Sequence, residues 1–230
     1  MGAQLGHGLH PDGRLMPVVE LRQYTLHPGR RDELIDLFER EFVESQEDVG
    51  ITLIGQFRDL DDPERFVWLR GFPDMAARQR SLQAFYFGPV WQAHREEANA
   101  TMIDSDNVLL LRPLDQGYAF TPGKRKPVGA AGPGPGRVVG GVHALRGHDD
   151  PLPRKFVHET IPALRKTGAG SIATLVTDTS PNDFPRLPLR EGEHVLVWFA
   201  AFADAAQGLI PEQSIQRLRL EPTARSNLHG

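Results

Sequence analysis

The sequence predicts an α+β protein made of two tandem ferredoxin-like units, each with the element order β-α-β-β-α-β and an antiparallel sheet. Two observations predict this fold class. Strand-like and helix-like periodicities follow that order over the first half of the 230-residue chain. The same pattern then returns in the second half, which indicates an internal repeat.

The first unit is expected over residues 16–115. Its strands are predicted where apolar and polar residues alternate, and its helices where apolar residues recur at helical spacing. In chain order the sequence predicts a strand over 18–26, a helix over 31–46, strands over 51–59 and 66–72, a helical region over 75–100 with a break near Gly88-Pro89, and a strand over 108–112. One face of this sheet packs the helices, and the other face needs a cover.

Two segments lie outside the predicted units. Residues 116–136 contain the run PGKRKPVGAAGPGPG, whose Pro and Gly content predicts a linker. Residues 1–15 are polar and lack the apolar core of a signal peptide, so we expect a disordered extension there.

The second unit is expected over residues 137–230, because the segment HVLVWFAAFADAA aligns with RFVWLRGFPDMAA. A shortened second helix is predicted, since few residues separate Ala206 from Ser214. The loop after the second strand of this unit is longer than its counterpart in the first unit. A single offset matches Trp198 with Trp68, Phe202 with Phe72 and Asp204 with Asp74.

The composition is that of a globular protein and excludes several function classes. Apolar residues make up 40% of the chain and charged residues 24%, with a formal net charge of −4. This balance gives no general attraction to phosphate or anionic lipid, so we expect no nucleic-acid partner and no membrane span. The absence of cysteine removes disulfides and Cys-bound metals, and it fits a cytoplasmic location. No Gly-rich phosphate loop follows a strand, and His158-Glu159 is not followed by a second His at the spacing of a zinc protease, so we expect neither a cofactor nor a metal site.

Several motifs resemble the NIPSNAP family. The first is Glu20-Leu21-Arg22-x-Tyr24-Thr25-Leu26-x-Pro28-Gly29, followed by Val67–Phe72 and by Pro89-Val90-Trp91-Gln92. In the second half, Asn182–Pro188 followed by Val197-Trp198-Phe199 resembles two-copy bacterial members. The likeness covers most of residues 18–225 outside the linker.

The resemblance implies a fold of the dimeric α+β-barrel type, in which two sheets pack bare face to bare face around a pocket. Relatives in that wider superfamily include cofactor-free monooxygenases, haem-degrading enzymes and small-molecule isomerases. It also implies a homo-oligomer. The barrel could close within one chain or between chains.

Strand parity selects the candidate site. If Val19 and Leu21 face the helices, then Glu20, Arg22 and Tyr24 face the enclosed pocket. By the same rule Trp68 and Arg70 share that interior. Buried charges are costly unless they are paired. Charged side chains inside the barrel therefore indicate either an ion pair or a ligand site.

The roles expected of these residues follow from their chemistry. Arg22, Arg70 and Trp68 are candidate ligand-binding residues for a small anionic or aromatic molecule, and Tyr24 and Glu20 are candidate catalytic residues that handle protons. The second copy is aligned with Gly140, Val142 and Ala144 at the positions of Glu20, Arg22 and Tyr24, and with Ala200 at Arg70. The polar set is therefore expected once per chain. His143 is expected to pack in the core on the helix-facing side of its strand.

Two functions remain open from the sequence. The first is an enzyme, a cofactor-independent monooxygenase or an isomerase. The alternative is a non-catalytic binding or scaffold protein whose barrel mediates self-association, with Glu20 in a structural ion pair to Arg22 or Arg70.

Overall fold

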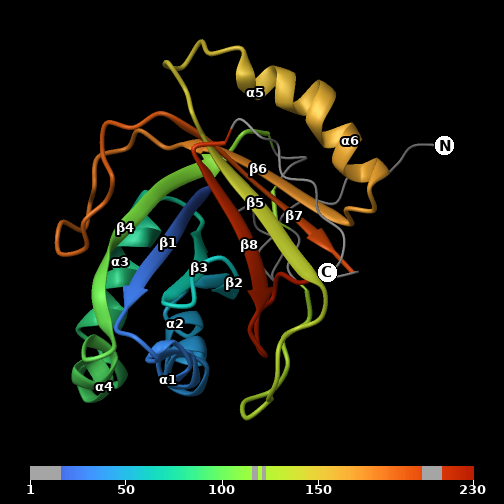
Figure 1. Ribbon diagram of the computed structural model, residues 1–230. Coiled ribbons are helices and arrows are strands. Elements are labelled where there is room, and N and C mark those ends of the chain that lie inside the picture. Colours follow the sequence, from blue (N-terminus) through green and yellow to red (C-terminus); the bar gives the residue numbers. More distant parts are fainter. Residues whose placement is uncertain (1–16, 116–118, 121–122, 204–213) are drawn as a thin grey trace.

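Eight strands form one closed barrel, in the order β1-β3-β2-β8-β5-β7-β6-β4 (Figure 1). The computed structural model describes residues 17–115, 119–120, 123–203 and 214–230. The predicted extension over 1–15, the match of Asp204 to Asp74 and the shortened helix between Ala206 and Ser214 lie outside these residues.

The first half of the chain contributes four strands and two groups of helices. The elements are β1 (Val18–Leu26), α1 (Arg31–Leu37), the π-helical turn η1 (Phe38–Phe42), α2 (Val43–Glu47), β2 (Thr52–Asp59), β3 (Arg65–Phe72), α3 (Met75–Tyr86), α4 (Pro89–Asn99) and β4 (Met102–Pro113). The helical region breaks between α3 and α4 as the sequence predicts, because Gly88 caps the new helix and Pro89 occupies its first turn.

The second half repeats the strand pattern with shorter helices. Its elements are β5 (Arg137–Ala144), α5 (Leu152–Lys155), the π-helical turn η3 (Phe156–Thr160), α6 (Ile161–Lys166), β6 (Ser171–Thr177), β7 (Val195–Phe202) and β8 (Gln216–Pro222). The helices of the two halves lie on opposite sides of the barrel (Figure 1). The predicted α+β class with antiparallel strands is confirmed.

β4 is longer than the sequence predicts. It begins at Met102 rather than Val108, and none of residues 102–107 is buried. This segment carries Asp104 and Asp106 and has no apolar alternation. Pairing with β1, including Thr25 with Asp104 and Leu26 with Met102, makes it a strand without burial. A pattern search for buried strands therefore misses it.

The barrel closes within the single chain. Each half supplies four neighbouring strands, β4-β1-β3-β2 and β8-β5-β7-β6. Two antiparallel seams join them: β2 pairs with β8 from Phe57 opposite Pro222, and β4 pairs with β6 from Leu111 opposite Thr177. The bare face of each half is thus covered by the other half of the same chain.

The barrel interior is an apolar cluster to which both halves contribute. Its members include Val19, Leu21, Leu69, Val197 and Leu218, all buried. Two further clusters lie outside the barrel wall, one between the first-half strands and α1–α4 and one between the second-half strands and α5–α6. Most strand residues are therefore buried on both faces, so the strands carry near-continuous apolar runs.

The C-terminal residues 223–230 fasten the second half to the first. The backbone N–H of Arg225 donates to Glu39 Oε1 at 2.8 Å, and its guanidinium pairs with Glu44. Leu228 belongs to the barrel-interior cluster. Next to this segment, Gly123 N–H donates to the carbonyl oxygen of Asn227 at 2.7 Å, and Arg125 Nη2 donates to the carbonyl oxygen of Leu53 at 3.1 Å, so part of the Pro/Gly-rich segment is bound to the C-terminal residues and to the first half.

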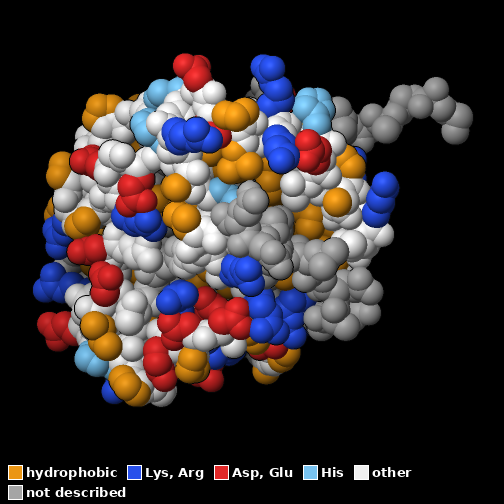
Figure 2. All heavy atoms as spheres, turned by 45° about the horizontal axis from the view of Figure 1, so that its top comes forward, with side chains coloured by type: hydrophobic (Ala, Val, Ile, Leu, Met, Phe, Trp, Pro, Cys, Tyr) orange, Lys and Arg blue, Asp and Glu red, His pale blue; other side chains and the backbone are white. Residues whose placement is uncertain are grey.

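The surface carries mixed charge. Acidic and basic side chains are interspersed on the face that Figure 2 shows, in line with the small net charge. Within the described part of the chain, no helix combines the length and the apolar character needed to cross a bilayer.

Candidate functional site

The polar residues of β1 face the helices, so their predicted place inside the barrel is wrong. Val19 and Leu21 belong to the barrel-interior cluster, whereas Tyr24 belongs to the cluster beneath α1–α4. Glu20 and Arg22 share the parity of Tyr24 and are buried. The physical reason is that the barrel interior is lined by apolar side chains from all strands, while the helices supply polar partners for charges.

Glu20 is the centre of the site. Its Oε2 accepts from Arg22 Nη1 at 2.7 Å and from Arg70 Nε at 2.7 Å. Its Oε1 accepts from Arg78 Nε, on α3, at 2.7 Å. All four side chains are at most 1% exposed. Both carboxylate oxygens are therefore engaged by guanidinium groups and shielded from bulk solvent.

The charge state of Glu20 follows from these partners. Burial by itself raises the pKa of Glu20, but Arg70, Arg22 and Arg78 outweigh it and hold the pKa well below its usual range. Glu20 is consequently an ionised anchor for three arginines at any physiological pH.

Arg22, Tyr24 and Trp68 form a stacked group next to Glu20. Arg22 Nε donates to Tyr24 Oη at 3.1 Å, and the guanidinium carbon lies 5.5 Å and 5.4 Å from the ring centroids of Tyr24 and Trp68. Such cation–π contacts suit arginine beside an indole. Burial raises the pKa of Tyr24 although Arg22 opposes it. Tyr24 is thus a neutral phenol whose oxygen accepts from Arg22 and whose hydrogen remains available to donate.

The second half of the chain contributes an acidic group to this first-half site. Arg78 Nη1 contacts the carboxylate of Asp183 and lies 3.3 Å from Asn182 Oδ1. Both residues lie in the long loop between β6 and β7. The site then holds the three arginines against two carboxylates, Glu20 and Asp183, which leaves one surplus positive charge.

A small cavity adjoins the arginine cluster. It measures about 30 Å³ and is lined mainly by aromatic side chains, with Gln46 as a polar member. The lining residues are Tyr24, Leu34, Phe38, Phe42, Gln46, Trp68, Phe85, Tyr86, Trp91, Ala98 and Met102. Arg70 connects the cavity to the cluster, since its guanidinium lies 5.2 Å from Trp68 and 6.0 Å from Tyr86 and donates to Gln46 Oε1 at 3.4 Å. A cavity of this volume holds about one water molecule.

Three buried N–H donors of this region have no hydrogen-bond acceptor among the described residues. They are Trp68 Nε1, Arg70 Nη2 and Arg78 Nη2. Arg70 Nη2 nevertheless lies 2.7 Å from Glu20 Oε2 in an ion pair, so Trp68 Nε1 and Arg78 Nη2 are the two donors left without a partner among the described residues. Buried donors without acceptors are uncommon and costly, so their grouping here marks a place where an acceptor can bind.

All five residues predicted from the sequence, Glu20, Arg22, Tyr24, Trp68 and Arg70, come together at this site.

Four further members were not predicted. Gln46, Arg78 and Tyr86 lie on helices, whose inward faces the strand parity does not address. Asp183 lies in the second half, where the sequence signals were the length of its loop and the motif Asn182–Pro188, and neither indicates a contact with the first half.

The second half lacks the polar residues of the first at the matching positions. The alignment of β5 with β1, however, differs by one residue from the one that the sequence suggested. Trp68 pairs with Arg22, and Trp198 pairs with Gly141. The residues matching Glu20, Arg22 and Tyr24 are therefore Val139, Gly141 and His143, one position before those aligned by sequence.

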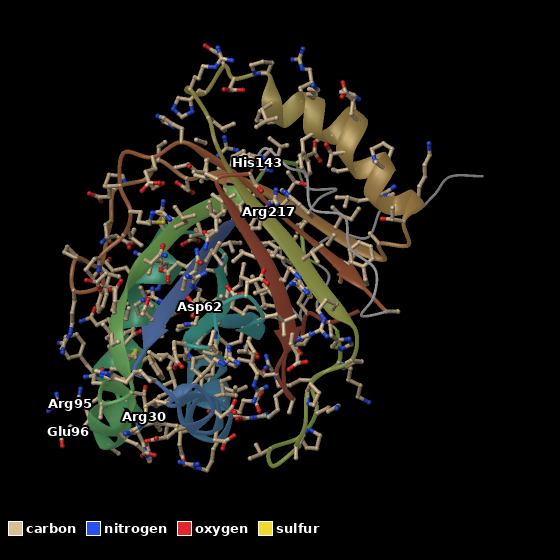
Figure 3. All side chains as sticks on the ribbon, in the orientation of Figure 1. Arg30, Asp62, Arg95, Glu96, His143 and Arg217 are labelled. Atoms are coloured by element: carbon tan, nitrogen blue, oxygen red, sulfur yellow. The ribbon has the colours of Figure 1, made fainter. Side chains whose placement is uncertain are left out.

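His143 takes the place of Tyr24 without recreating the site. It accepts from Trp198 Nε1 at 3.1 Å and lies against Phe156, in the helix-facing core as predicted. Figure 3 labels it in the upper part of the molecule, beside β5. Ala200 faces Val139 where Arg70 faces Glu20, so this pair lacks the charges of its counterpart. Among the described residues, no group of three or more His, Cys, Asp or Glu side chains could hold a metal ion.

Comparison with known proteins places the first half in one family. The family model described as NIPSNAP matches residues 19–116. A NIPSNAP-like domain protein from Burkholderia xenovorans is 29% identical, over 46% of this chain and 91% of its own, with a TM-score of 0.42. No curated protein matches the chain.

Two solved structures resemble the whole chain. A protein from Fusobacterium nucleatum, provisionally described as a monooxygenase, is 10% identical over 94% of this chain and 96% of its own, with a TM-score of 0.55. A protein from Lactobacillus acidophilus with the same provisional description is 15% identical over 92% and 98%, with a TM-score of 0.52. At these identities the likeness concerns the fold alone.

Proposed function

This chain is a NIPSNAP family protein through residues 19–116, and we propose that these residues bind a small anionic or aromatic molecule between the sheet and α1–α4. The cavity beside Arg70, extended by movement of the side chains that close it, is the place of binding. The proposal keeps the five residues predicted from the sequence and moves the pocket from the barrel interior to the helix side of the barrel wall.

One observation carries the proposal: two buried N–H donors without a partner among the described residues, Trp68 Nε1 and Arg78 Nη2, belong to a cluster with a surplus positive charge, and Trp68 also lines the aromatic cavity. A buried unpaired donor costs about 1–3 kcal/mol, and more when the group is charged. An anionic ligand supplies an acceptor for these donors and a negative charge beside the arginines. Aromatic walls formed by Trp68 and Tyr86 suit a planar ligand.

The chemistry that fits this arrangement is stabilisation of an anion that develops on the ligand. Tyr24 is neutral and can donate its hydroxyl hydrogen to an enolate or phenolate oxygen, while Arg70 supplies positive charge. Glu20 holds the arginines in place and does not carry protons, because both its oxygens are engaged. We therefore favour a cofactor-independent oxygenation or isomerisation of an enolisable molecule over a reaction in which Glu20 acts as a base.

We also propose that the two halves are tandem ferredoxin-like units, over residues 16–115 and 137–230, joined by a linker over 116–136. The equal strand orders, β4-β1-β3-β2 and β8-β5-β7-β6, support this division. So does the matched pairing of Arg22 with Trp68 and of Gly141 with Trp198.

The alternative function, a scaffold whose barrel mediates self-association, has less support. Self-association through the barrel requires a sheet face that another copy covers. Here the seams β2–β8 and β4–β6 close the barrel inside one chain, so each half already covers the other. A homodimer would use another surface; it and the cytoplasmic location remain predictions from the sequence.

Ligand-observed NMR with a panel of aromatic carboxylates, phenols and enolisable keto acids tests the proposal. At least one probe should bind the wild type, and Arg70→Gln should weaken its binding about tenfold or more through loss of a charge-assisted contact. Arg95→Gln is the matched control, because Arg95 lies on α4 with an exposed side chain that points away from the barrel (Figure 3).

A second variant protects the test against misfolding of Arg70→Gln. Trp68→Phe keeps an aromatic side chain and removes the unpartnered indole N–H together with one ring of the indole. It should weaken binding less than Arg70→Gln does. The proposal is wrong if no probe binds, or if probes bind equally well to wild type and both variants.

A further inference from the structure

The loop between β6 and β7, residues 178–194, reaches from the second half onto the first. The corresponding loop between β2 and β3 spans only residues 60–64. In Figure 1 the long loop, drawn in orange, lies beside β4 and α3. Leu187 and Leu189 of this loop pack against the cluster beneath α1–α4.

Two neighbouring residues of the loop bring a carboxylate and a ring to the candidate site. The carboxylate of Asp183 contacts Arg78 Nη1, and its carbonyl oxygen accepts from Gln79 Nε2 at 3.0 Å. The ring of Phe184 stacks on Tyr86, with 6.0 Å between ring centroids and an interplanar angle of 27°. Tyr86 also lines the small cavity.

From this geometry we propose that the site takes a small aromatic carboxylate, and that Asp183-Phe184 occupies the place of this ligand in the unliganded protein. The inference rests on the proposed function, because it names the ligand class of the same site. The carboxylate of the ligand replaces Asp183 on Arg78. Its ring replaces Phe184 against Tyr86 and extends toward the cavity.

The burial of Arg78 explains why Asp183 is displaced only when a ligand carboxylate takes its place. Arg78 is 0% exposed and already shares Glu20 with two other arginines. Leaving it without a second anion would add an uncompensated buried charge. Asp183, in contrast, is 21% exposed, so solvent reaches the carboxylate that has to move.

The loop also keeps its local shape through contacts that do not involve Arg78. Asn182 Nδ2 donates to the carbonyl oxygen of Leu187 at 2.9 Å, and Phe184 N–H donates to Asn182 Oδ1 at 3.1 Å. Asp183 and Phe184 are therefore presented together by one turn, as the two parts of a single ligand would be.

Titration of 4-fluorobenzoate, followed by ¹⁹F NMR, tests the inference. Asp183→Asn removes the loop carboxylate that competes with the probe for Arg78. The dissociation constant of the probe should therefore fall about tenfold, because the state with a free binding site becomes more populated. Phe184→Ala should also tighten binding, by vacating the ring position. Glu191→Gln is the matched control: it removes an exposed acidic group of the same loop and should leave the affinity unchanged.

The outcomes separate the inference from the proposed function. If 4-fluorobenzoate binds wild type, Asp183→Asn and Phe184→Ala equally, and Arg70→Gln weakens it, the site is real but the loop does not occupy it. If 4-fluorobenzoate binds none of the proteins although thermal unfolding shows that all of them are folded, the inference fails. The proposed function still holds in that case if another probe of the panel binds, and the site is then not one for aromatic carboxylates. Tighter binding by both loop variants and not by Glu191→Gln supports it.

Discussion

At the scale of single residues, the charge balance of the first half depends on Glu20. Its two oxygens accept from Arg22, Arg70 and Arg78, and none of these side chains is more than 1% exposed. A buried ion pair adds little net stability compared with an apolar replacement, yet removal of one partner is costly because the others stay charged. Glu20 contacts all three guanidinium groups, whereas Asp183 contacts only Arg78, so the loss of Glu20 should be more damaging than the loss of any one arginine.

Glu20→Gln should lower the free energy of unfolding by about 3–5 kcal/mol, since it removes the negative charge and keeps the shape. Urea denaturation at neutral pH measures this. Glu33→Gln is the control: its ion pair with Arg30 is exposed and should contribute less than about 1 kcal/mol. Equal stability of the two variants would contradict the role assigned to Glu20.

The pH dependence of stability follows from the same residue. The pKa of Glu20 is lower in the folded protein than its ordinary value of 4.5. Its stabilising contribution is therefore fully present above the ordinary pKa and is lost as the pH falls below it toward the folded-state pKa. Urea midpoints measured from neutral pH down to about pH 3 should fall more steeply for wild type than for Glu20→Gln. Parallel profiles would show that Glu20 is not ionised in the folded state.

At the scale of elements, the strand pattern identifies the strands but not which face of β1 meets the helices. The alternation of Val19 and Leu21 with Glu20, Arg22 and Tyr24 is the same whichever face is inside the barrel. Both faces are buried, so exposure does not distinguish them. The deciding partners, Arg78 on α3 and Asp183 in the long loop, are distant in sequence. Candidate residues could be selected from the sequence, but their location could not.

The register of β5 shows a second limit of the same kind. An alignment of Val138–Leu145 with the first strand is one residue away from the pairing that the structure has, because small residues such as Gly140 and Gly141 carry no side-chain pattern. A shift by one residue in a strand moves every side chain to the opposite face. The match of Glu20 with Val139 therefore follows from the strand pairing in the structure, and the sequence alignment does not give it.

Neither glycine of β5 leaves room for a Cβ atom, and Gly141 is the one that pairs with Trp198. A Cβ atom at Gly141 would lie 2.7 Å from Trp198 Nε1. Gly141→Ala should therefore destabilise the protein by about 1–3 kcal/mol through overpacking. Gly170→Ala is the control, because its nearest neighbour would lie at 3.8 Å. Urea denaturation of both variants makes the comparison, and equal midpoints would argue against the close approach.

At the scale of the whole molecule, the two halves share one hydrophobic core. The barrel interior contains residues of both halves, among them Leu21, Leu69, Val197 and Leu218. Leu228, near the C-terminus, belongs to the same cluster although residues 223–230 lie on the first half. The repeat could be predicted from the sequence, but closure within one chain could not, because two copies of the chain could form the same seams.

A shared core predicts cooperative unfolding. Calorimetry should show one transition for the protein, because neither half can lose its sheet without exposing the interior face of the other. Leu228→Ala should lower the free energy of unfolding by about 2–5 kcal/mol and keep a single transition. Leu60→Ala, at a side chain that is 40% exposed, serves as the control. Two separate transitions would show that the halves are independent.

Closure of the barrel within one chain also determines how many ligands it can hold. A barrel assembled from two identical chains would carry each arginine cluster and each long loop twice, and its two sites would be equivalent. In this chain the first half keeps the arginine cluster, and the second half keeps the loop that reaches it. The proposed function therefore predicts one ligand per barrel, because within the described residues the arginine cluster occurs in the first half alone.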